Sequence, residues 1–396
     1  MKNTMQHESG GAVNMSASEV LWIILTAALG VQLIFALWNA TCLPKIRSFP
    51  ADRLQQQDTL VSVLIPARNE RLHIEGCLES VLASDTTGYR MEVLVLDDRS
   101  EDETAALVQA IADRDARVRL LEGVHPSAGW MGKSHACHQL VQEAKGEWFM
   151  FVDADVRLEP EAIRHTVAAG CDLGRGLVTG FPYQVAKTWM EKLVVPMMVF
   201  TIISHLPIFM IRRSSSPVFV AATGAFLLIH RSSYEASGGH AAIQGDLVDD
   251  MSLAKAVKRA GHPVMLADVH EWVSTRMYQN GTEVWNGYKK NMYEGTGRRD
   301  VLLLGALFMY TLMYLVPPLG LLFGLLSGSS TAIWFGLIGT LLGMGVKRVA
   351  DQTGGQPWWL ACLQPVSMAC VIGIGMASWM AGRSGKGYVW KGRRYS

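Results

Sequence analysis

Two acidic pairs have the residue types and spacing to bind a metal ion beside a phosphate group. Asp97 and Asp98 follow the apolar run MEVLVL, and Asp153 and Asp155 follow WFMFV in the pattern Asp-x-Asp. Carboxylates at this spacing offer hard oxygen ligands to Mg²⁺ or Mn²⁺, which in turn can bridge a diphosphate. A single acidic turn after a strand is common, so the prediction depends on finding two such pairs at strand ends.

A third acidic pair and a lysine extend this candidate site. Asp249 and Asp250 open the pattern DDMSLAKAVKRAG, which predicts a helix whose dipole also favours acidic residues in its first turn. Beside a metal site, such a carboxylate can act as general base toward an acceptor hydroxyl or carboxyl group. Lys133 lies in GWMGKSHACHQ, but a Walker A loop would need glycine in place of Ser127. Lys133 is therefore either a phosphate ligand of another kind or a solvated residue at a helix start.

The elements that must position these residues alternate between strand and helix from about residue 60 to residue 299. The runs LVSVLIPA, MEVLVLDD, VRLLEG and WFMFVDADV predict strands, and helical periodicity is found between them. Alternation of this kind is typical of an α/β domain with helices covering both faces of a sheet. Ligands of such sheets bind beyond the carboxyl ends of the strands, which is where two of the acidic pairs fall.

The composition indicates that this domain is joined to a membrane portion. The chain has 396 residues, of which 49% are hydrophobic, and its mean hydropathy is +0.18. After a polar N-terminus (1–19), residues 20–43 form an uncharged apolar stretch that is long enough to cross a bilayer. Lys45, Arg47 and Arg53 follow it. This basic excess predicts that the next domain lies in the cytoplasm, in a protein of the cell membrane.

Further apolar segments occur within and after the α/β domain. Residues 188–213 are interrupted by Pro196 and Pro207, and we expect them to form interfacial helices instead of a crossing. Residues 300–382 hold three apolar segments and precede a basic tail, 383–396. Three crossings here would leave this basic tail outside the cell, whereas the positive-inside rule places basic segments on the cytoplasmic side. We therefore expect one segment to be re-entrant, either the short middle one or the proline-bearing last one.

Charge and cysteine content exclude several classes of protein. The formal net charge is +1, from 36 basic and 35 acidic residues, so no overall field favours binding to nucleic acid. The six cysteines include no Cys-x-x-Cys pair, which argues against a zinc site or a disulfide framework. We therefore expect a multi-pass membrane enzyme without a nucleic-acid partner.

The order of short motifs resembles that of family 2 glycosyltransferases with the GT-A fold. Within this family the chain is most similar to the membrane-bound bacterial branch that glycosylates terpenoid lipids. The resemblance implies a Rossmann-like mixed sheet that binds a nucleotide sugar, flanked by transmembrane helices. It covers about residues 60–297 and is carried by IPARNE, VLDDRSEDET, GWMGKSHACHQL, FVDADV, DDMSLAKAVKRAG and TRMYQNGTEVWNGYKKN.

The resemblance also implies roles for individual residues. Asp153 and Asp155 match the metal-binding Asp-x-Asp, and Lys133 matches a lysine near the nucleotide and its diphosphate. Asp250 matches the catalytic aspartate, whereas Asp249 stands where the family has glutamate, so the choice of general base between the two stays open. The nucleotide-binding loop and the uracil or ribose site are matched by Pro66, Ala67, Arg68, Glu70, Asp97 and Asp98.

The acceptor side departs from the ceramide and cellulose branches of the family. Their Q/R-x-x-R-W motif is replaced by EVWNGYKK, which resembles the terpenoid branch. We expect Arg276, Trp285 and Lys289 to face the acceptor or the diphosphate. An equally weighted alternative is that an anchor at the membrane interface is formed by Trp285, Tyr288, Lys289 and Lys290.

The resemblance implies an inverting hexosyltransferase that depends on Mg²⁺ or Mn²⁺. The expected donor is a UDP-sugar, with UDP-glucose first among them, and the expected acceptor is a lipid such as a carotenoid acid or another terpenoid. Three alternatives stay open: a processive polysaccharide synthase, a ceramide-type or diacylglycerol glucosyltransferase, and a non-catalytic membrane scaffold. The missing motif argues against a polysaccharide synthase and against a ceramide acceptor, and the presence of all three acidic pairs with Lys133 argues against a scaffold.

Overall fold

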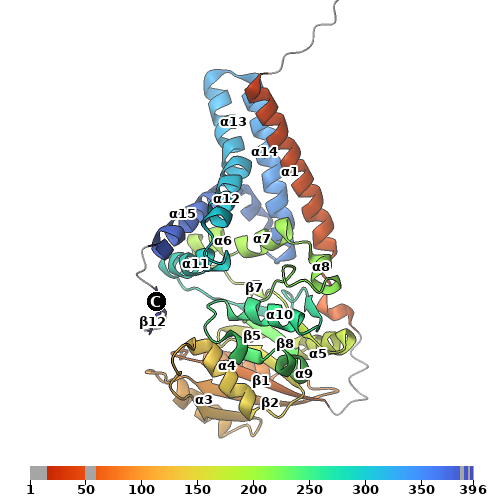
Figure 1. The fold of residues 1–396 in the computed structure, drawn as a ribbon, viewed down its shortest axis with the longest axis vertical. Coiled ribbons are helices and arrows are strands. Elements are labelled where there is room, and N and C mark those ends of the chain that lie inside the picture. Colours follow the sequence, from red (N-terminus) through yellow and green to blue (C-terminus); the bar gives the residue numbers. More distant parts are fainter. Residues whose placement is uncertain (1–15, 50–58, 384–387, 391–392, 396) are drawn as a thin grey trace, which may run out of the picture.

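A computed structural model describes residues 16–49, 59–383, 388–390 and 393–395 of the chain. An α/β domain occupies one end of the molecule, and a bundle of long helices rises from it (Figure 1). The predictions above also used residues that lie outside the described ones: Arg53, most of the polar N-terminus and half of the basic tail.

A seven-stranded sheet forms the centre of the α/β domain, in the order β3-β2-β1-β4-β8-β6-β9. The first four of these strands are parallel, whereas β8 runs antiparallel to both β4 and β6. The expected mixed, Rossmann-like sheet is thus confirmed. Its strands are β1 (Leu60–Ala67), β2 (Arg90–Asp97), β3 (Val118–Glu122), β4 (Trp148–Val152), β6 (Leu177–Thr179), β8 (Phe226–His230) and β9 (Val264–Leu266).

A second, three-stranded sheet begins where β4 ends. The run WFMFVDADV is not one strand, because β4 stops at Val152 and the next strand starts at Val156. Asp153 and Asp155 therefore lie in the turn between the two sheets. The smaller sheet has the order β5-β10-β7 and consists of β5 (Val156–Leu158), β7 (Tyr183–Gln184) and β10 (Val273–Thr275). Beyond the last helix, β11 (Tyr388–Trp390) pairs with β12 (Arg393–Tyr395).

Helices connect the strands and cover the larger sheet, and the helical segments expected between the first four predicted strands are all present. Short 3₁₀ helices occur at Ile46–Ser48 (η1) and Gly239–Ile243 (η3). The longer helices of the domain are α2 (Ile74–Leu82), α3 (Thr104–Ala112), α4 (Gly132–Glu143), α5 (Ala162–Leu173), α9 (Arg231–Ala236), α10 (Asp249–Arg259) and α11 (Gly281–Gly295).

Both faces of the larger sheet are buried, and alternate residues of its central strands point to opposite cores. In β1, Val63 belongs to one hydrophobic cluster and Leu64 to the other, and Met150 and Phe151 of β4 divide in the same way. Burial on both faces explains why these strands read as continuous apolar runs. The cluster around Leu64 also takes in residues of the long helices, so this core continues from the domain into the bundle.

Within the part of the chain that the structure describes, four helical segments are long and apolar enough to cross a membrane. α1, α13 and α14 lie side by side in the bundle (Figure 1). The segment at 300–327 has a π-helical turn, Thr311–Leu315, in its middle. The four are α1 (Ala17–Thr41), Asp300–Ser327 with α12 (Asp300–Tyr310) and α13 (Val316–Ser327), α14 (Ser330–Thr353), and Trp358–Arg383 with η5 (Trp358–Leu363) and α15 (Gln364–Arg383).

The last of these segments is arranged differently from the other three. α15 packs against α11 and α12 at the end of the bundle next to the α/β domain (Figure 1). Near its start, the side-chain amide of Gln356 donates to the carbonyl of Gln184 at 2.9 Å. Near its end, the hydroxyl of Ser378 donates to the carbonyl of Lys289. Both ends of the segment 358–383 are therefore held at the level of the α/β domain.

The segment 188–213 forms three short helices, α6 (Trp189–Val194), α7 (Met197–His205) and α8 (Ile208–Arg213). They are separated at Pro196 and Pro207, because proline has no backbone N–H to donate to a helical hydrogen bond. Asn39 of α1 fastens the second break, because its amide donates to the carbonyls of Ile203 and Leu206 and accepts from the amide of Ile208. None of the three is long enough to span a bilayer, and their position at the interface stays a prediction.

Candidate functional site

A cavity of about 1340 Å³ follows the carboxyl ends of the central strands and continues along α11. At one end it is bounded by the end of β1 and the loop after it, from Pro66 to Glu70, and at the other by Ser378 and Gly382 of α15. The cavity thus joins the α/β domain to the helices next to it.

The cavity gathers most of the predicted site residues, but two of them do not line it. Asp97 does not line it, because its carboxylate is turned into the loop and accepts from the amide of Ser100. Trp285 is outside it as well, and it packs against the buried cluster of Val194, Val195, Tyr278, Val284 and Ile374. The predicted residues that do line it are Pro66, Ala67, Arg68, Glu70, Asp98, Lys133, Asp153, Asp155, Asp249, Asp250, Arg276 and Lys289.

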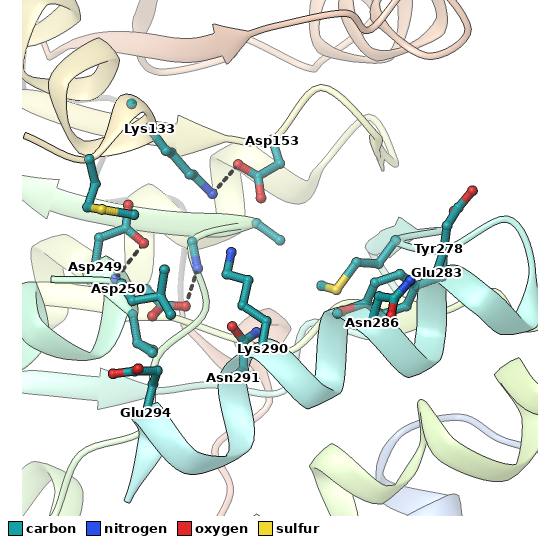
Figure 2. A pocket seen from close by; sticks show the side chains of 18 of the residues that line it. Lys133, Asp153, Asp249, Asp250, Tyr278, Glu283, Asn286, Lys290, Asn291 and Glu294 are labelled. Carbon is teal, nitrogen blue, oxygen red and sulfur yellow. Dashed lines mark hydrogen bonds and ion pairs between the residues drawn. The ribbon is translucent and has the colours of Figure 1, made fainter. Parts of the chain in front are cut away.

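The Asp-x-Asp turn and Lys133 meet at the centre of the cavity. The ammonium of Lys133, in the first turn of α4, lies 2.6 Å from the Oδ1 atom of Asp153 (Figure 2). Burial lowers the pKa of Lys133, but the carboxylates of Asp153 and Asp249 outweigh it and hold the pKa above its usual value. Lys133 is therefore a fully charged cation at neutral pH, facing a space lined by acids.

The carboxylates of Asp153 and Asp155 suit a hard divalent ion that also binds water or phosphate oxygens. Burial, followed by the charges of Asp153 and Glu70, raises the pKa of Asp155 to about 6, so a cation here would relieve real repulsion. Among the described residues there is no group of three or more His, Cys, Asp or Glu side chains placed to hold a metal. Two carboxylates completed by water and substrate phosphate are the usual surroundings of Mg²⁺.

Asp250 is fixed more firmly than its neighbour Asp249. Its Oδ2 accepts from the amide of Gly224 at 2.9 Å and its Oδ1 from the amide of Met251 at 2.7 Å. Burial, and then the charge of Asp249, raise the pKa of Asp250 to about 6. A carboxylate that titrates near the working pH is well matched to proton transfer.

Gly224 is a site residue that sequence reasoning missed. A Cβ atom at this position would lie 3.0 Å from the ammonium of Lys133 and 3.7 Å from the Cβ of Asp250. The absence of a side chain lets the lysine and the aspartate approach the same backbone segment. The only signal in the sequence was a small-residue stretch, AATGA, before an apolar run.

Helix α11 contributes a polar face that was also only partly foreseen. Lys290 points from this helix toward the space between Lys133 and Asp250 (Figure 2). Burial lowers the pKa of Lys290 to about 8, while the charge of Asp249 acts in the opposite direction. The residues of this face recur at helical spacing, and this spacing is the sequence signal that would have indicated the face. They are Glu283, Asn286, Lys290, Asn291 and Glu294.

Arg276 lines the cavity, but its guanidinium is bound to protein groups. Its Nε and Nη2 atoms lie 3.2 Å from the two carboxylate oxygens of Glu191, and Nη1 donates to Gln279. Glu191 is only 1% exposed and also closes the capping box of α6 with Thr188. Arg276 therefore connects α6 to the segment that leads into α11.

We expect Arg276→Met to destabilise the protein more than it affects chemistry. Removing the cation leaves the buried carboxylate of Glu191 unpaired, which typically costs about 3–5 kcal/mol. Burial would raise the pKa of Glu191, but hydrogen bonds from Arg276, Lys187 and Thr188 lower it to about 2. The stabilisation is therefore complete above pH 4.5 and is lost as the pH falls toward 2.

Thermal unfolding in detergent, followed by circular dichroism at pH 7, measures this effect. Arg212→Met is the matched control, because Arg212 pairs with Asp172 in an exposed salt bridge that should contribute little. Equal unfolding midpoints for the two variants would contradict the structural role given to Arg276.

The fold and the site together define a class of protein. A mixed sheet with carboxylates beyond β2 and β4, facing a cavity with a lysine, is the arrangement of a GT-A glycosyltransferase domain. The structure is similar to that of a mannosyltransferase from Pyrobaculum calidifontis in complex with GDP-mannose and Mn²⁺. The TM-score is 0.55 with 17% identity, and the match covers 90% of this chain and 98% of the other, which supports the fold assignment.

The sequence comparisons give the family. Residues 62–238 match the family described as glycosyl transferase family 2. The chain is 26% identical over 316 residues to 4,4'-diaponeurosporenoate glycosyltransferase of Staphylococcus aureus strain MRSA252, covering 77% of this chain and 78% of the relative. It is 28% identical over 273 residues to the enzyme of strain N315, and this match covers 66% of this chain and 68% of the relative. The α/β domain is therefore a family 2 glycosyltransferase domain, and the protein is a glycosyltransferase.

Proposed function

We propose that this protein transfers a sugar from a UDP-sugar, with UDP-glucose as the expected donor, to the polar end of a membrane lipid, with inversion at the anomeric carbon. The observation that carries the proposal is the continuous cavity between Lys133 at the centre of the α/β domain and Ser378 on α15. A cavity of this kind can hold a water-soluble donor at one end and a lipid acceptor at the other.

The donor end is assigned to the nucleotide and its diphosphate. The loop from Pro66 to Glu70 and Asp98 would surround the nucleoside, and Asp153 with Asp155 would hold Mg²⁺ or Mn²⁺. The ion would supply charge stabilisation for the departing diphosphate. The Mn²⁺ in the Pyrobaculum complex is consistent with this choice. Lys133, at 2.6 Å from Asp153, is placed to donate to the same phosphate oxygens.

Asp250 is assigned as the general base. Its carboxylate, held by the amides of Gly224 and Met251, would accept the proton of the acceptor oxygen while that oxygen attacks the anomeric carbon. The bond from this carbon to the diphosphate breaks, and the diphosphate leaves with the electron pair. Attack from the side opposite the leaving group inverts the anomeric centre.

The acceptor end is assigned to a lipid with a small polar head. Apolar side chains are exposed on the adjoining helices, among them Met376 and Met380 of α15, and Met380 also lines the cavity. The S. aureus relative carries a carotenoid acid in its name. A terpenoid acid or a related lipid is therefore the first acceptor to test.

The arrangement of the helices supports three crossings, by α1, by 300–327 and by α14, with a cytoplasmic catalytic domain. The segment 358–383, held at the domain at both ends, and the three short helices at 188–213 would lie in the membrane interface. In a protein freed of its six natural cysteines, single cysteines at Ser18 and Ser327 should react with an impermeant maleimide outside intact cells. Cysteines at Glu101 and Arg383 should react only after permeabilisation. Labelling of position 383 from outside would show instead that α15 crosses.

The transfer reaction is tested with detergent-purified protein, a panel of nucleotide sugars, Mg²⁺ or Mn²⁺, and a total lipid extract of the host. Nucleoside diphosphate release, the masses of new glycolipids and the anomeric configuration of the product are the readouts. A glycolipid that is absent with Asp155→Ala and Asp250→Asn would establish the activity. A folded protein that binds no nucleotide and turns over no donor would favour a membrane scaffold.

A further inference from the structure

Lys258 is a buried lysine in the last turn of α10, and it is only 3% exposed. Its ammonium donates to the backbone carbonyls of Phe219 at 2.6 Å and Ser214 at 2.9 Å, and it lies 3.5 Å from that of Ser216. A charge is tolerated in a protein interior only where its hydrogen bonds are satisfied, and three carbonyls can satisfy the three donors of a lysine. Lys258 therefore fastens the segment 214–219 to the end of α10.

The segment 214–219 has few attachments besides Lys258. It follows directly after Arg213, the last residue of α8, and its side chains are exposed or half-buried. Among the described residues, its other hydrogen bonds are local: the amide of Ser214 donates to the carbonyl of Met210, and the rest lie within the segment. The contacts with Lys258 are thus the hydrogen bonds that join this segment to α10.

The chain that follows the segment reaches the start of the same helix. The amide of Ala222 donates to the Sδ atom of Met251 at 3.3 Å, and the amide of Gly224 donates to Oδ2 of Asp250 at 2.9 Å. Residues 214–224 therefore lie along α10 and are hydrogen-bonded near both of its ends.

We propose that Lys258 is a positioning residue for the general base, Asp250. By fastening the segment 214–219, it holds the amide of Gly224 against the carboxylate of that base. The inference rests on the proposed function, in which Asp250 is the base, and it assigns a role to a residue outside the cavity.

The hydrogen bonds of the base explain why this tether matters. The carboxylate of Asp250 accepts from the amides of Gly224 and Met251, and of these two donors only Gly224 comes from outside α10. If the segment 214–219 were released, this outer donor would move, and the carboxylate would lose the orientation in which it can accept a proton. Proton transfer requires hydrogen-bond reach, so a small displacement of the base slows the reaction.

The first test compares sugar transfer by Lys258→Met and the wild type, with the full-length protein in detergent. We expect kcat to fall by about 10- to 100-fold, as for a misplacement of a reacting group by about 1 Å, while the Kd of UDP in the presence of Mn²⁺ stays unchanged. Arg259→Met is the matched control, because Arg259 is the next residue of α10 and is exposed. Equal kcat values for the two variants, or weaker UDP binding by Lys258→Met, would overturn the inference.

A double-mutant cycle with Asp250→Asn tests whether Lys258 acts through the base. Substitutions at separate positions have additive effects unless the positions are coupled. In the Asp250→Asn background the base is already absent, so Lys258→Met should change the residual kcat by less than about 2-fold. An equal loss of kcat in both backgrounds would mean that Lys258 supports the fold in general, and the proposed positioning role would be wrong.

Hydrogen/deuterium exchange tests the tether without any reaction. Peptides that cover residues 214–224 should take up deuterium faster in Lys258→Met than in the wild type or in Arg259→Met, because exchange reports local opening. Lys258→Arg keeps a cation that can donate to the same carbonyls and should stay close to the wild type. If Lys258→Met does not fold, Lys258→Gln, which is shorter and uncharged, replaces it in all three measurements. Unchanged exchange would show that Lys258 is not the tether.

The exchange measurement also separates failure of the inference from failure of the proposed function. If the wild type forms a glycolipid and the loss of the Lys258 ammonium changes neither exchange nor kcat, sugar transfer stands and the role of Lys258 is wrong. If no donor gives a product with the host lipid extract, the proposed transfer itself is wrong. The role of Lys258 toward a base is then overturned with it, whatever the exchange shows.

Discussion

Replacing Asp250 by asparagine is expected to lower sugar transfer to a protonated acceptor by about 10²–10⁴-fold, the range for loss of a general base. The amide keeps the size of the side chain and can still accept from the backbone amide of Gly224, so donor binding should persist. The measurement is kcat for the glycolipid product together with the Kd for UDP in the presence of Mn²⁺. Loss of UDP binding in parallel with kcat would indicate a structural defect instead of a missing base.

The pH dependence of the wild type provides a second, independent signature. Burial, and then the charge of Asp249, raise the pKa of Asp250 to about 6. Its basic form is therefore lost as the pH falls below about 6, and kcat/KM of the wild type should fall in the same range. The residual activity of Asp250→Asn should not show this acidic decline. A decline that persists in the variant would assign the titration to another group.

The same experiment decides between the two aspartates that the sequence left open. Asp249 accepts from the amide of Asp250 at 3.1 Å and contributes negative charge to it. Asp249→Asn should therefore shift the acidic decline to lower pH and reduce transfer less than Asp250→Asn does. If Asp249→Asn is the more damaging change, the assignment of the base is reversed.

Much of the donor site could be predicted because its residues sit at strand ends. A strand buried on both faces reads as an apolar run, so the ends of β2 and β4 were visible as the points where MEVLVL and WFMFV meet acidic residues. The parallel order then brings these ends to one edge. The one of these carboxylates that does not line the cavity, Asp97, differs in which way its side chain turns within a loop, and periodicity carries no such information.

The acceptor side could not be predicted to the same extent, because it depends on packing between distant elements. Lys289 and Lys290 are adjacent in the sequence, and only the direction of α11 against α15 decides which of them faces the aspartates. Arg276 looked like a ligand for an anion until the fold placed Glu191 beside it. Hydropathy likewise marks 358–383 as apolar, but it cannot show that both ends of this segment are held at the α/β domain.

Replacing Asp155 by alanine is expected to remove the metal dependence of donor binding and to lower transfer by about 10²–10³-fold, which corresponds to a few kcal/mol of lost charge stabilisation. With only Asp153 left, the turn between β4 and β5 would offer one carboxylate, and Lys133 already lies 2.6 Å from it. The remaining carboxylate would then be neutralised by the lysine instead of by a divalent ion. The Asp-x-Asp turn and the lysine thus act as one charge-balanced unit, which binds a diphosphate only when the ion supplies the additional positive charge.

Isothermal titration of UDP with and without Mn²⁺ measures this prediction directly. The wild type should bind more tightly with the ion and lose that gain in EDTA, whereas Asp155→Ala should bind equally weakly in both conditions. Asp113→Asn, an exposed aspartate at the end of α3, is the control for a change of charge alone and should keep the full metal effect. If Asp155→Ala retains the effect, the ion is held elsewhere, and the assignment of the donor end to the Asp-x-Asp turn is wrong. If EDTA leaves wild-type transfer unchanged, Lys133 must balance the diphosphate without a divalent ion, and the metal role proposed for the Asp-x-Asp turn would be wrong.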